Sequence, residues 1–245
     1  MTTPIVLITG AGRGIGAATA RLAASRGFDV AVNYLKDRAS ADAVVADVAA
    51  TGRRAIAVQA DMGREDDIAR MFATVDDKLG RITHLVYNTG ITGPMSRVEA
   101  LAAKDAQEIL ATNVLGAFLC ARAAIPRIST RHGGRGGAMV FLSSAMATLG
   151  GAGEYVMYSV SKGAIDTLTI GLARELAHEG IRVNAVAPGP IATDIHPPGR
   201  LERITQAVPL GRAGTTGEVA EAVVFLLSEA STYTTGAVLR VAGGR

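Results

Sequence analysis

The stretch Thr9-Gly10-Ala11-Gly12-Arg13-Gly14-Ile15-Gly16 decides how this chain begins to fold. It follows the short apolar run Ile5–Ile8 and opens the segment Ile15–Ser25, where apolar residues recur with helical spacing. A strand, a glycine-rich turn and a helix in that order match the G-x-G-x-x-G/A pattern of dinucleotide sites, starting here at Gly12. In such a turn, backbone amides and the helix N-terminus face a pyrophosphate with no Cβ in the way. The turn therefore predicts a dinucleotide site at Gly10, Gly12, Arg13, Gly14, Ile15 and Gly16.

Strand and helix patterns alternate from this turn to the end of the 245-residue chain. Short β-branched runs predict strands at 5–8, 30–34, 55–58, 83–87, 138–142, 182–187 and 238–241. Helical spacing predicts helices at 15–25, 41–50, 65–78, 104–128, 155–178 and 217–227. This alternation predicts an α/β fold, a single Rossmann-type doubly wound sheet of seven mostly parallel strands with helices on both faces. No linker or composition shift divides residues 1–245, so we expect one domain with its ligand crevice at the carboxyl ends of the strands.

Composition argues against several other classes of protein. The 25 basic and 22 acidic residues are interspersed, so a pI of about 9.2 comes with no basic face for nucleic acid. The single cysteine, Cys120, lies in an apolar run and is expected to be a buried helix residue. The four histidines are scattered, so no catalytic metal is expected. With no leader pattern and no apolar stretch approaching 18 residues, we expect no membrane partner and a cytoplasmic location.

The end of the second predicted strand favours NADP(H) over NAD(H). A site for NAD carries an acidic residue about 20 positions after the glycine turn, where it binds the ribose 2′-hydroxyl. Here the strand ends in Asn33 and Tyr34, both expected at the cofactor, while Asp29 precedes the strand and Asp37 follows it. Cations bind a 2′-phosphate through charge-assisted hydrogen bonds. Three cationic side chains lie nearby in the sequence, those of Arg13, Lys36 and Arg38. Simple solvent exposure explains Lys36 and Arg38 equally well.

A second informative stretch is Tyr158-Ser159-Val160-Ser161-Lys162. Its tyrosine and lysine are four residues apart on a helical pattern, so their side chains share one face. A free phenol has a pKa of about 10, too high for efficient proton exchange near neutral pH, and a nearby ammonium lowers it. A shift of three units requires roughly 4 kcal/mol. Taken alone, this motif is explained equally well by two exposed side chains on a helix. Together with the glycine turn, it favours acid–base chemistry at a nicotinamide.

With both stretches in place, the chain resembles the short-chain dehydrogenase/reductase family over nearly its whole length. The resemblance implies an oxidoreductase that transfers hydride between a nicotinamide and a carbonyl or secondary alcohol, with Tyr158 as general acid and base. It implies that Ser144 hydrogen-bonds the substrate oxygen, that Lys162 binds the nicotinamide ribose and lowers the Tyr158 pKa, and that Asn113 anchors a relay water. It implies further cofactor contacts at Asp61, Met62, Asn88, Thr89, Gly90, Pro188, Gly189, Ile191 and Thr193. A small-molecule substrate and a homotetramer are also implied.

The sequence departs from the family pattern in two places. Thr89 stands where the family usually has alanine, a change that we expect the site to tolerate. Thirteen residues separate Ser144 from Tyr158, one more than in many members, so Ser143 is an alternative to Ser144. Neighbouring side chains on a strand point to opposite faces, and we expect Ser144 to be the one that points to the crevice.

The substrate remains open at this stage. Besides a general carbonyl reductase, the alternatives are a sugar or alcohol dehydrogenase, a 3-oxoacyl-thioester reductase and, remotely, a non-catalytic NADP(H)-binding regulator. Residues 190–212 are expected to form a substrate lid, because glycine and proline punctuate them, with 195–204 moving over the bound cofactor. We expect Tyr155 in the pocket wall or in packing, and Glu154 in a solvated loop rather than facing the substrate.

Overall fold

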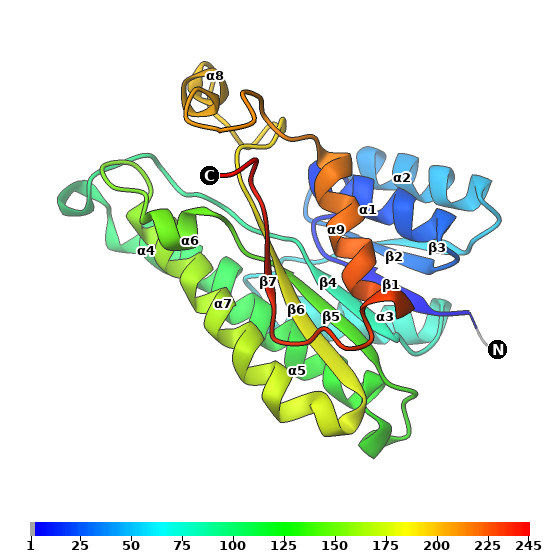
Figure 1. The fold of residues 1–245 in the computed structure, drawn as a ribbon. Coiled ribbons are helices and arrows are strands. Elements are labelled where there is room, and N and C mark those ends of the chain that lie inside the picture. The colour runs from blue at the N-terminus through cyan, green and yellow to red at the C-terminus, as the bar shows by residue number, and fades with distance from the viewer. Residues whose placement is uncertain (1–2) are drawn as a thin grey trace.

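A computed structural model describes residues 3–245 as a seven-stranded parallel sheet in the order β3-β2-β1-β4-β5-β6-β7 (Figure 1). Every neighbouring pair of strands is parallel. The order reverses between β1 and β4, which is the point where doubly wound folds bind ligands. The predicted fold class is confirmed. The strands are β1 Ile5–Ile8, β2 Asp29–Tyr34, β3 Ala55–Gln59, β4 His84–Tyr87, β5 Gly137–Leu142, β6 Ile181–Pro188 and β7 Val238–Val241.

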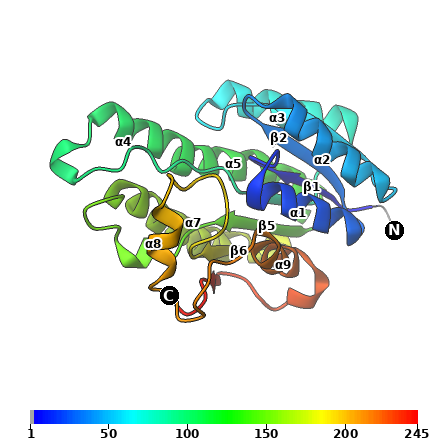
Figure 2. The same cartoon turned by 90° about the horizontal axis from the view of Figure 1, so that it is seen from above.

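Helices cover both faces of this sheet (Figures 1 and 2). One buried layer joins α3, α5 and α7 to the sheet, and the other joins α1, α2 and α9 to its opposite face. Two short helices, α6 and α8, lie at the carboxyl end of the sheet and were not predicted, because four to six residues carry too little periodicity. The helices are α1 Gly14–Ser25, α2 Arg38–Ala50, α3 Glu65–Lys78, α4 Ala103–Leu110, α5 Gly116–Ile128, α6 Met146–Leu149, α7 Val156–Leu176, α8 Arg200–Thr205 and α9 Thr216–Leu227.

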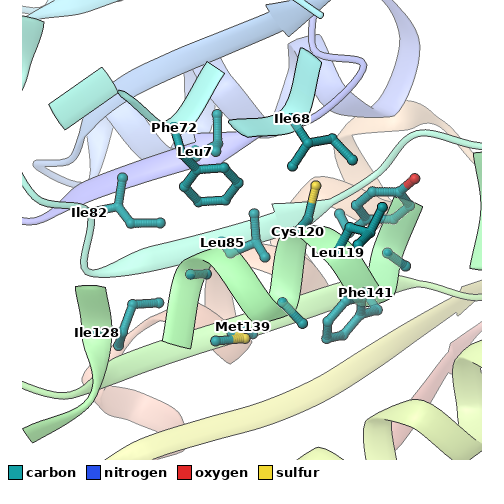
Figure 3. Packing of buried hydrophobic residues seen from close by; sticks show 14 of the residues in the cluster. Leu7, Ile68, Phe72, Ile82, Leu85, Leu119, Cys120, Ile128, Met139 and Phe141 are labelled. Carbon is teal, nitrogen blue, oxygen red and sulfur yellow. The ribbon is translucent and has the colours of Figure 1, made fainter. Parts of the chain in front are cut away.

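The first layer forms a close-packed core around α5 (Figure 3). Phe72 of α3 and Phe141 of β5 lie on either side of the α5 residue Cys120, and all three are at most 1% exposed. Burial raises the pKa of the Cys120 thiol well above its usual range, so the thiolate does not form near neutral pH. This confirms Cys120 as a buried helix residue.

The predicted single helix 104–128 is interrupted by a π-helical turn, Ala111–Leu115. The turn is tied to the sheet, because the Tyr87 hydroxyl donates a hydrogen bond to the Thr112 carbonyl. Gly116 then lets the helix lie directly on the chain after β3, where an added Cβ would come within 2.2 Å of the Met62 carbonyl oxygen. Such π-turns are frequent at functional sites, and this one carries Asn113.

The expectation that no apolar stretch approaches 18 residues was wrong for the helical run Ala103–Ile128. Its 26 residues include an 18-residue window of mean hydropathy 1.6, enough by length and composition alone to span a membrane. The window is 44% buried in this structure, and α5 packs on α3 and on strands β4 and β5. This is the placement of a core helix, and charged residues at its start had hidden the apolar run.

Candidate active site

A cavity of about 710 Å³ opens at the carboxyl ends of the strands, between the glycine turn, the start of α7 and the 190–212 segment. The size suits a small-molecule or cofactor site. Most of the predicted site residues come together here although the first and last of them, Gly10 and Thr193, are 183 positions apart in sequence. Those that line it are Gly10, Gly12, Arg13, Gly14, Ile15, Tyr34, Asn88, Thr89, Gly90, Ser144, Tyr158, Lys162, Pro188, Gly189, Ile191 and Thr193.

The glycine turn has the shape of an anion cradle. Gly10 and Gly14 adopt φ angles of +60° and +57°, which side chains with a Cβ rarely adopt. A Cβ on Gly16 would lie 2.5 Å from the Gly10 carbonyl oxygen, so this position also requires glycine. Helix α1 starts after Arg13 with no side-chain cap and no acidic residue in its first turn. Its first amides therefore point into the cavity as donors, which fits a pyrophosphate.

Five predicted site residues, Gly16, Asn33, Asp61, Met62 and Asn113, lie beside the cavity rather than in its lining. Asn33 is 1% exposed and fully engaged. Its Oδ1 accepts a hydrogen bond from the Gly10 amide at 3.0 Å, and its Nδ2 donates to the carbonyls of Val58 and Ala60. Asn33 thus positions the glycine turn against β2 and β3. Sequence spacing could not show this, because the partners lie 23 to 27 residues away.

Asp61 and Met62 follow the same pattern. The Asp61 carboxylate accepts the Gly63 amide at 2.8 Å, which closes a tight turn after β3. Met62 is 3% exposed and its sulfur lies 3.7 Å from the Cys120 sulfur in the core. Both side chains therefore have partners outside the cavity lining of the described residues.

One end of the cavity collects basic side chains. Arg13 and Lys36 line it, together with Tyr34. The Asp37 carboxylate lines it too, but it caps α2 by accepting hydrogen bonds from the amide and hydroxyl of Ser40. These bonds and the nearby Arg13 lower the pKa of Asp37. Arg38, the third predicted cation, instead pairs with Asp42 one turn along α2, outside the cavity lining of the described chain.

The opposite end carries the hydroxyl, the phenol and the ammonium. Ser144 lies beside the Tyr158 phenol, and its Oγ accepts the Met146 amide at 3.1 Å. Lys162 lies one turn further along α7, with Nζ 5.7 Å from the centre of the Tyr158 ring. The Ser143 hydroxyl is engaged elsewhere, because it donates to the Lys162 backbone carbonyl at 3.3 Å, an arrangement that supports Ser144 over Ser143.

Burial sets the protonation of these groups. It raises the pKa of the Tyr158 phenol above its ordinary value, while the Ser144 hydrogen bond and the charge of Arg200 act in the opposite direction. It lowers the pKa of Lys162, which is 3% exposed, to about 8, and the nearby Asp166 carboxylate offsets only part of that effect. The Lys162 ammonium donates to the Leu142 carbonyl at 2.6 Å, which leaves two of its three donors for a ligand.

The loop after β4 fits closely around the lysine. A Cβ on Gly90 would lie 3.1 Å from Lys162 Nζ. Asn113, in the π-turn, accepts the Ile91 amide and donates to the Ile91 carbonyl, both at 2.9 Å, and also donates to Ser161. Its side chain thereby fixes the loop and α7 together. Thr89 Oγ1 is buried with no hydrogen-bond partner among residues 3–245, packed against Gly10.

The 190–212 segment, which carries α8 (Figure 2), contributes residues to the lining at this end of the cavity. Arg200 and Arg203 of α8 both bind the carboxylate of Glu154, which sits in the loop before α7. Glu154 is only 24% exposed and lines the cavity, so the expectation of a solvated loop acid was wrong. Tyr155 is 6% exposed and also lines the cavity, as expected for a pocket wall. Neither arginine could be predicted as a site residue from the sequence, because their shared partner lies 46 to 49 residues away.

The comparisons with known proteins agree with this geometry. The model of the enoyl-(acyl carrier protein) reductase family matches residues 10–245. The chain is 45% identical to the uncharacterized oxidoreductase YgfF of Escherichia coli (strain K12), covering 98% of this chain and 99% of that protein. It is 39% identical to a 3-oxoacyl-[acyl-carrier-protein] reductase of Synechocystis, covering 100% and 97% respectively.

Solved structures show the same fold. A blue fluorescent protein from a metagenomic library, in complex with NADPH, is 33% identical with a TM-score of 0.92. A short chain dehydrogenase from Burkholderia cenocepacia J2315, in complex with NADP, is 34% identical with the same TM-score. Each alignment covers 98% of this chain and 97% of the other. This chain belongs to the short-chain dehydrogenase/reductase family and is an oxidoreductase that uses a nicotinamide cofactor.

Proposed function

We propose that this protein is an NADP(H)-dependent reductase of a small-molecule carbonyl compound, with Tyr158 as its general acid and base. One observation carries the proposal: Tyr158 and Ser144, with Lys162 beside the Tyr158 ring, share a single cavity with the basic end formed by Arg13 and Lys36. That arrangement supports acid–base chemistry at one end of an extended dinucleotide and binding of a phosphate at the other.

Each of these side chains has a separate role in the reaction. The cofactor, when bound, supplies or accepts the hydride. Ser144 donates a hydrogen bond to the substrate oxygen, and Tyr158 delivers a proton to that oxygen during reduction or removes it during oxidation. The Lys162 ammonium holds the nicotinamide ribose with its two free donors and favours the phenolate of Tyr158. Because Gly90 has no Cβ, the loop after β4 packs directly against the Lys162 ammonium.

The preference for NADP(H) rests on the end of β2. No acidic side chain ends this strand, and the Asn33 amide is engaged with Gly10, Val58 and Ala60, so it does not accept from a ribose hydroxyl. Asp37, the nearest carboxylate, is bound to Ser40. Arg13 and Lys36 line the cavity and are the cations that we expect to pair with a 2′-phosphate, although the Arg13 guanidinium also lies 3.8 Å from the exposed Asp194 carboxylate.

Absorbance at 340 nm tests both parts of the proposal. The wild-type protein is assayed with NADPH or NADH against small ketones, diketones, sugars and 3-oxoacyl thioesters, the last because relatives carry the name 3-oxoacyl-[acyl-carrier-protein] reductase. We expect NADPH-dependent reduction that Tyr158→Phe abolishes while NADPH still binds. Full activity in Tyr158→Phe contradicts the acid–base assignment. Tight NADPH binding without turnover of any compound favours the non-catalytic regulator.

A second pair of variants tests the cofactor preference. Arg13→Ala and Lys36→Ala are each expected to weaken NADPH binding about tenfold and to leave NADH binding unchanged, because only NADPH carries the 2′-phosphate. Arg38→Ala is the matched control, since Arg38 pairs with Asp42 and lies outside the cavity lining. Equal losses of affinity for NADPH and NADH would mean that Arg13 and Lys36 do not recognise the 2′-phosphate.

We also propose that the protein is a homotetramer. Large apolar side chains are exposed on the α4–α5–α7 layer and on β7, which is an edge strand of the sheet. Grouped exposure of this kind marks protein–protein contacts. Light scattering is expected to give about four times 25.1 kDa, and Phe118→Asp on α5 is expected to reduce that mass. The exposed residues are Leu110, Leu115, Phe118, Val160, Ile170, Val238 and Leu239.

A further inference from the structure

Arg200 holds an unusual position for a charged residue of a short lid helix. Its side chain is 12% exposed, whereas its neighbour Arg203 is 57% exposed. Arg200 lines the same cavity as Tyr158, and its guanidinium lies 4.8 Å from the centre of the Tyr155 ring, three residues before Tyr158. A charge this deeply buried needs partners, and Arg200 finds them among the residues of the cavity wall.

Four independent contacts keep the Arg200 guanidinium in place. Nε and Nη2 both donate to Glu154 Oε2 at 3.3 Å. Nη1 donates to His196 Nδ1 at 3.1 Å, while His196 Nε2 is 3.0 Å from the Ile191 carbonyl oxygen. His196 therefore serves as a neutral acceptor toward Arg200, and both burial and the Arg200 charge lower its pKa. Stacking on Tyr155 fixes the plane of the group.

The charges around Tyr158 come from several elements. Lys162 lies on its own helix, and burial brings the pKa of Lys162 to about 8, so above that pH the lysine loses its charge. Arginine keeps its charge at every pH that the protein survives. Arg200, together with the Ser144 hydrogen bond, acts to lower the pKa of Tyr158. The remaining charged or titratable groups that line the cavity or lie beside Lys162 are Glu154, Tyr155, Asp166, His196, Arg203, Arg245 and Asp194, the last of which pairs with Arg13.

We propose that Arg200 is a positioning residue for proton transfer: the lid helix α8 carries its permanent charge into the cleft, where it stabilises the phenolate form of Tyr158. Glu154 and His196 anchor Arg200 by its side-chain nitrogens, and closure of the lid thus completes the acid–base site. The inference rests on the proposed role of Tyr158 and adds a second cation to Lys162. It also ties the acidity of the phenol to the state of the lid.

The test measures the ionisation of Tyr158 directly, without turnover. The full-length protein is labelled with [¹³Cζ]tyrosine, and the Tyr158 signal is assigned by its loss in Tyr158→Phe. The phenolate-to-phenol ratio is then followed from pH 7 to 11 in the wild type, Arg200→Gln, Arg200→Lys and Arg203→Gln. Arg203→Gln is the matched control, because it removes the other arginine on Glu154 from a more exposed site.

In Arg200→Gln we expect the phenolate-to-phenol ratio at a given pH to fall about tenfold, the lower end of the effect of a nearby opposite charge. Arg200→Lys should retain most of the ratio, and Arg203→Gln should match the wild type. The midpoint of the pH profile of kcat, with any substrate that turns over, should rise in Arg200→Gln in parallel.

An unchanged or higher ratio in Arg200→Gln overturns the inference, as does an equal fall in Arg203→Gln. The proposed function fails by a different result, namely full turnover in Tyr158→Phe. Because the ionisation measurement needs no substrate, each of the two proposals can fail while the other stands.

Discussion

The charge of Lys162 is expected to destabilise the cofactor-free protein, and Lys162→Met exposes that cost. The lysine pKa falls from 10.5 to about 8 because the ammonium is buried. At about 1.36 kcal/mol per unit, the charged form in the folded protein is disfavoured by about 3 kcal/mol. The unfolded chain binds more protons between pH 8 and 10.5, so wild-type stability should rise with pH across that window.

The cost of burying the Lys162 charge is best measured by comparing the stability of Lys162→Met with that of the wild type at two pH values. Lys162→Met also removes the hydrogen bond to the Leu142 carbonyl, but that loss is the same at both pH values. We expect the free energy of unfolding of the variant, relative to the wild type, to fall by about 2 to 3 kcal/mol between pH 7 and pH 10. Urea denaturation at a fixed protein concentration measures it. The exposed Lys36→Met is the control and should show no such change.

A stability difference that is equal at pH 7 and pH 10 refutes the reasoning. It would mean that Lys162 is solvated in the cofactor-free state, and that burial does not poise it near neutral pH. Confirmation would show that a group needed for the proposed chemistry is held at the expense of stability, as is common for functional sites.

Three further outcomes follow from the packing. Gly16→Ala should destabilise the fold by about 1–3 kcal/mol and weaken NADPH binding, because its Cβ would meet the Gly10 carbonyl; thermal melts and titration measure both. Asn33→Ala should cost a similar amount in urea denaturation, since it leaves the Gly10 amide without its partner. Glu154→Gln should free α8 and speed tryptic cleavage after Arg203 several-fold, whereas an unchanged rate contradicts a Glu154-anchored lid.

Much of the fold could be predicted because its signals are local. The apolar runs, the helical spacing and the glycine turn each depend on residues within about 20 positions, and the observed strands start or end within one or two residues of the predicted bounds. Tyr158 and Lys162 share a helix face by their spacing alone. The π-turn at Asn113 and the helix α8 were missed because they interrupt or fall below the period that sequence patterns reveal.

The sequence by itself determined the class of fold, the place of the dinucleotide turn and the pair of side chains proposed for proton exchange. All three depend on the covalent spacing of residues along one strand, turn or helix. Only the tertiary structure decided that Asn33 supports the glycine turn and that Glu154 holds Arg200 beside the Tyr158 cleft. These roles depend on burial and on partners 23 to 46 residues away. Both are properties of the packed sheet, because the free energy of a charge or an amide depends on what surrounds it.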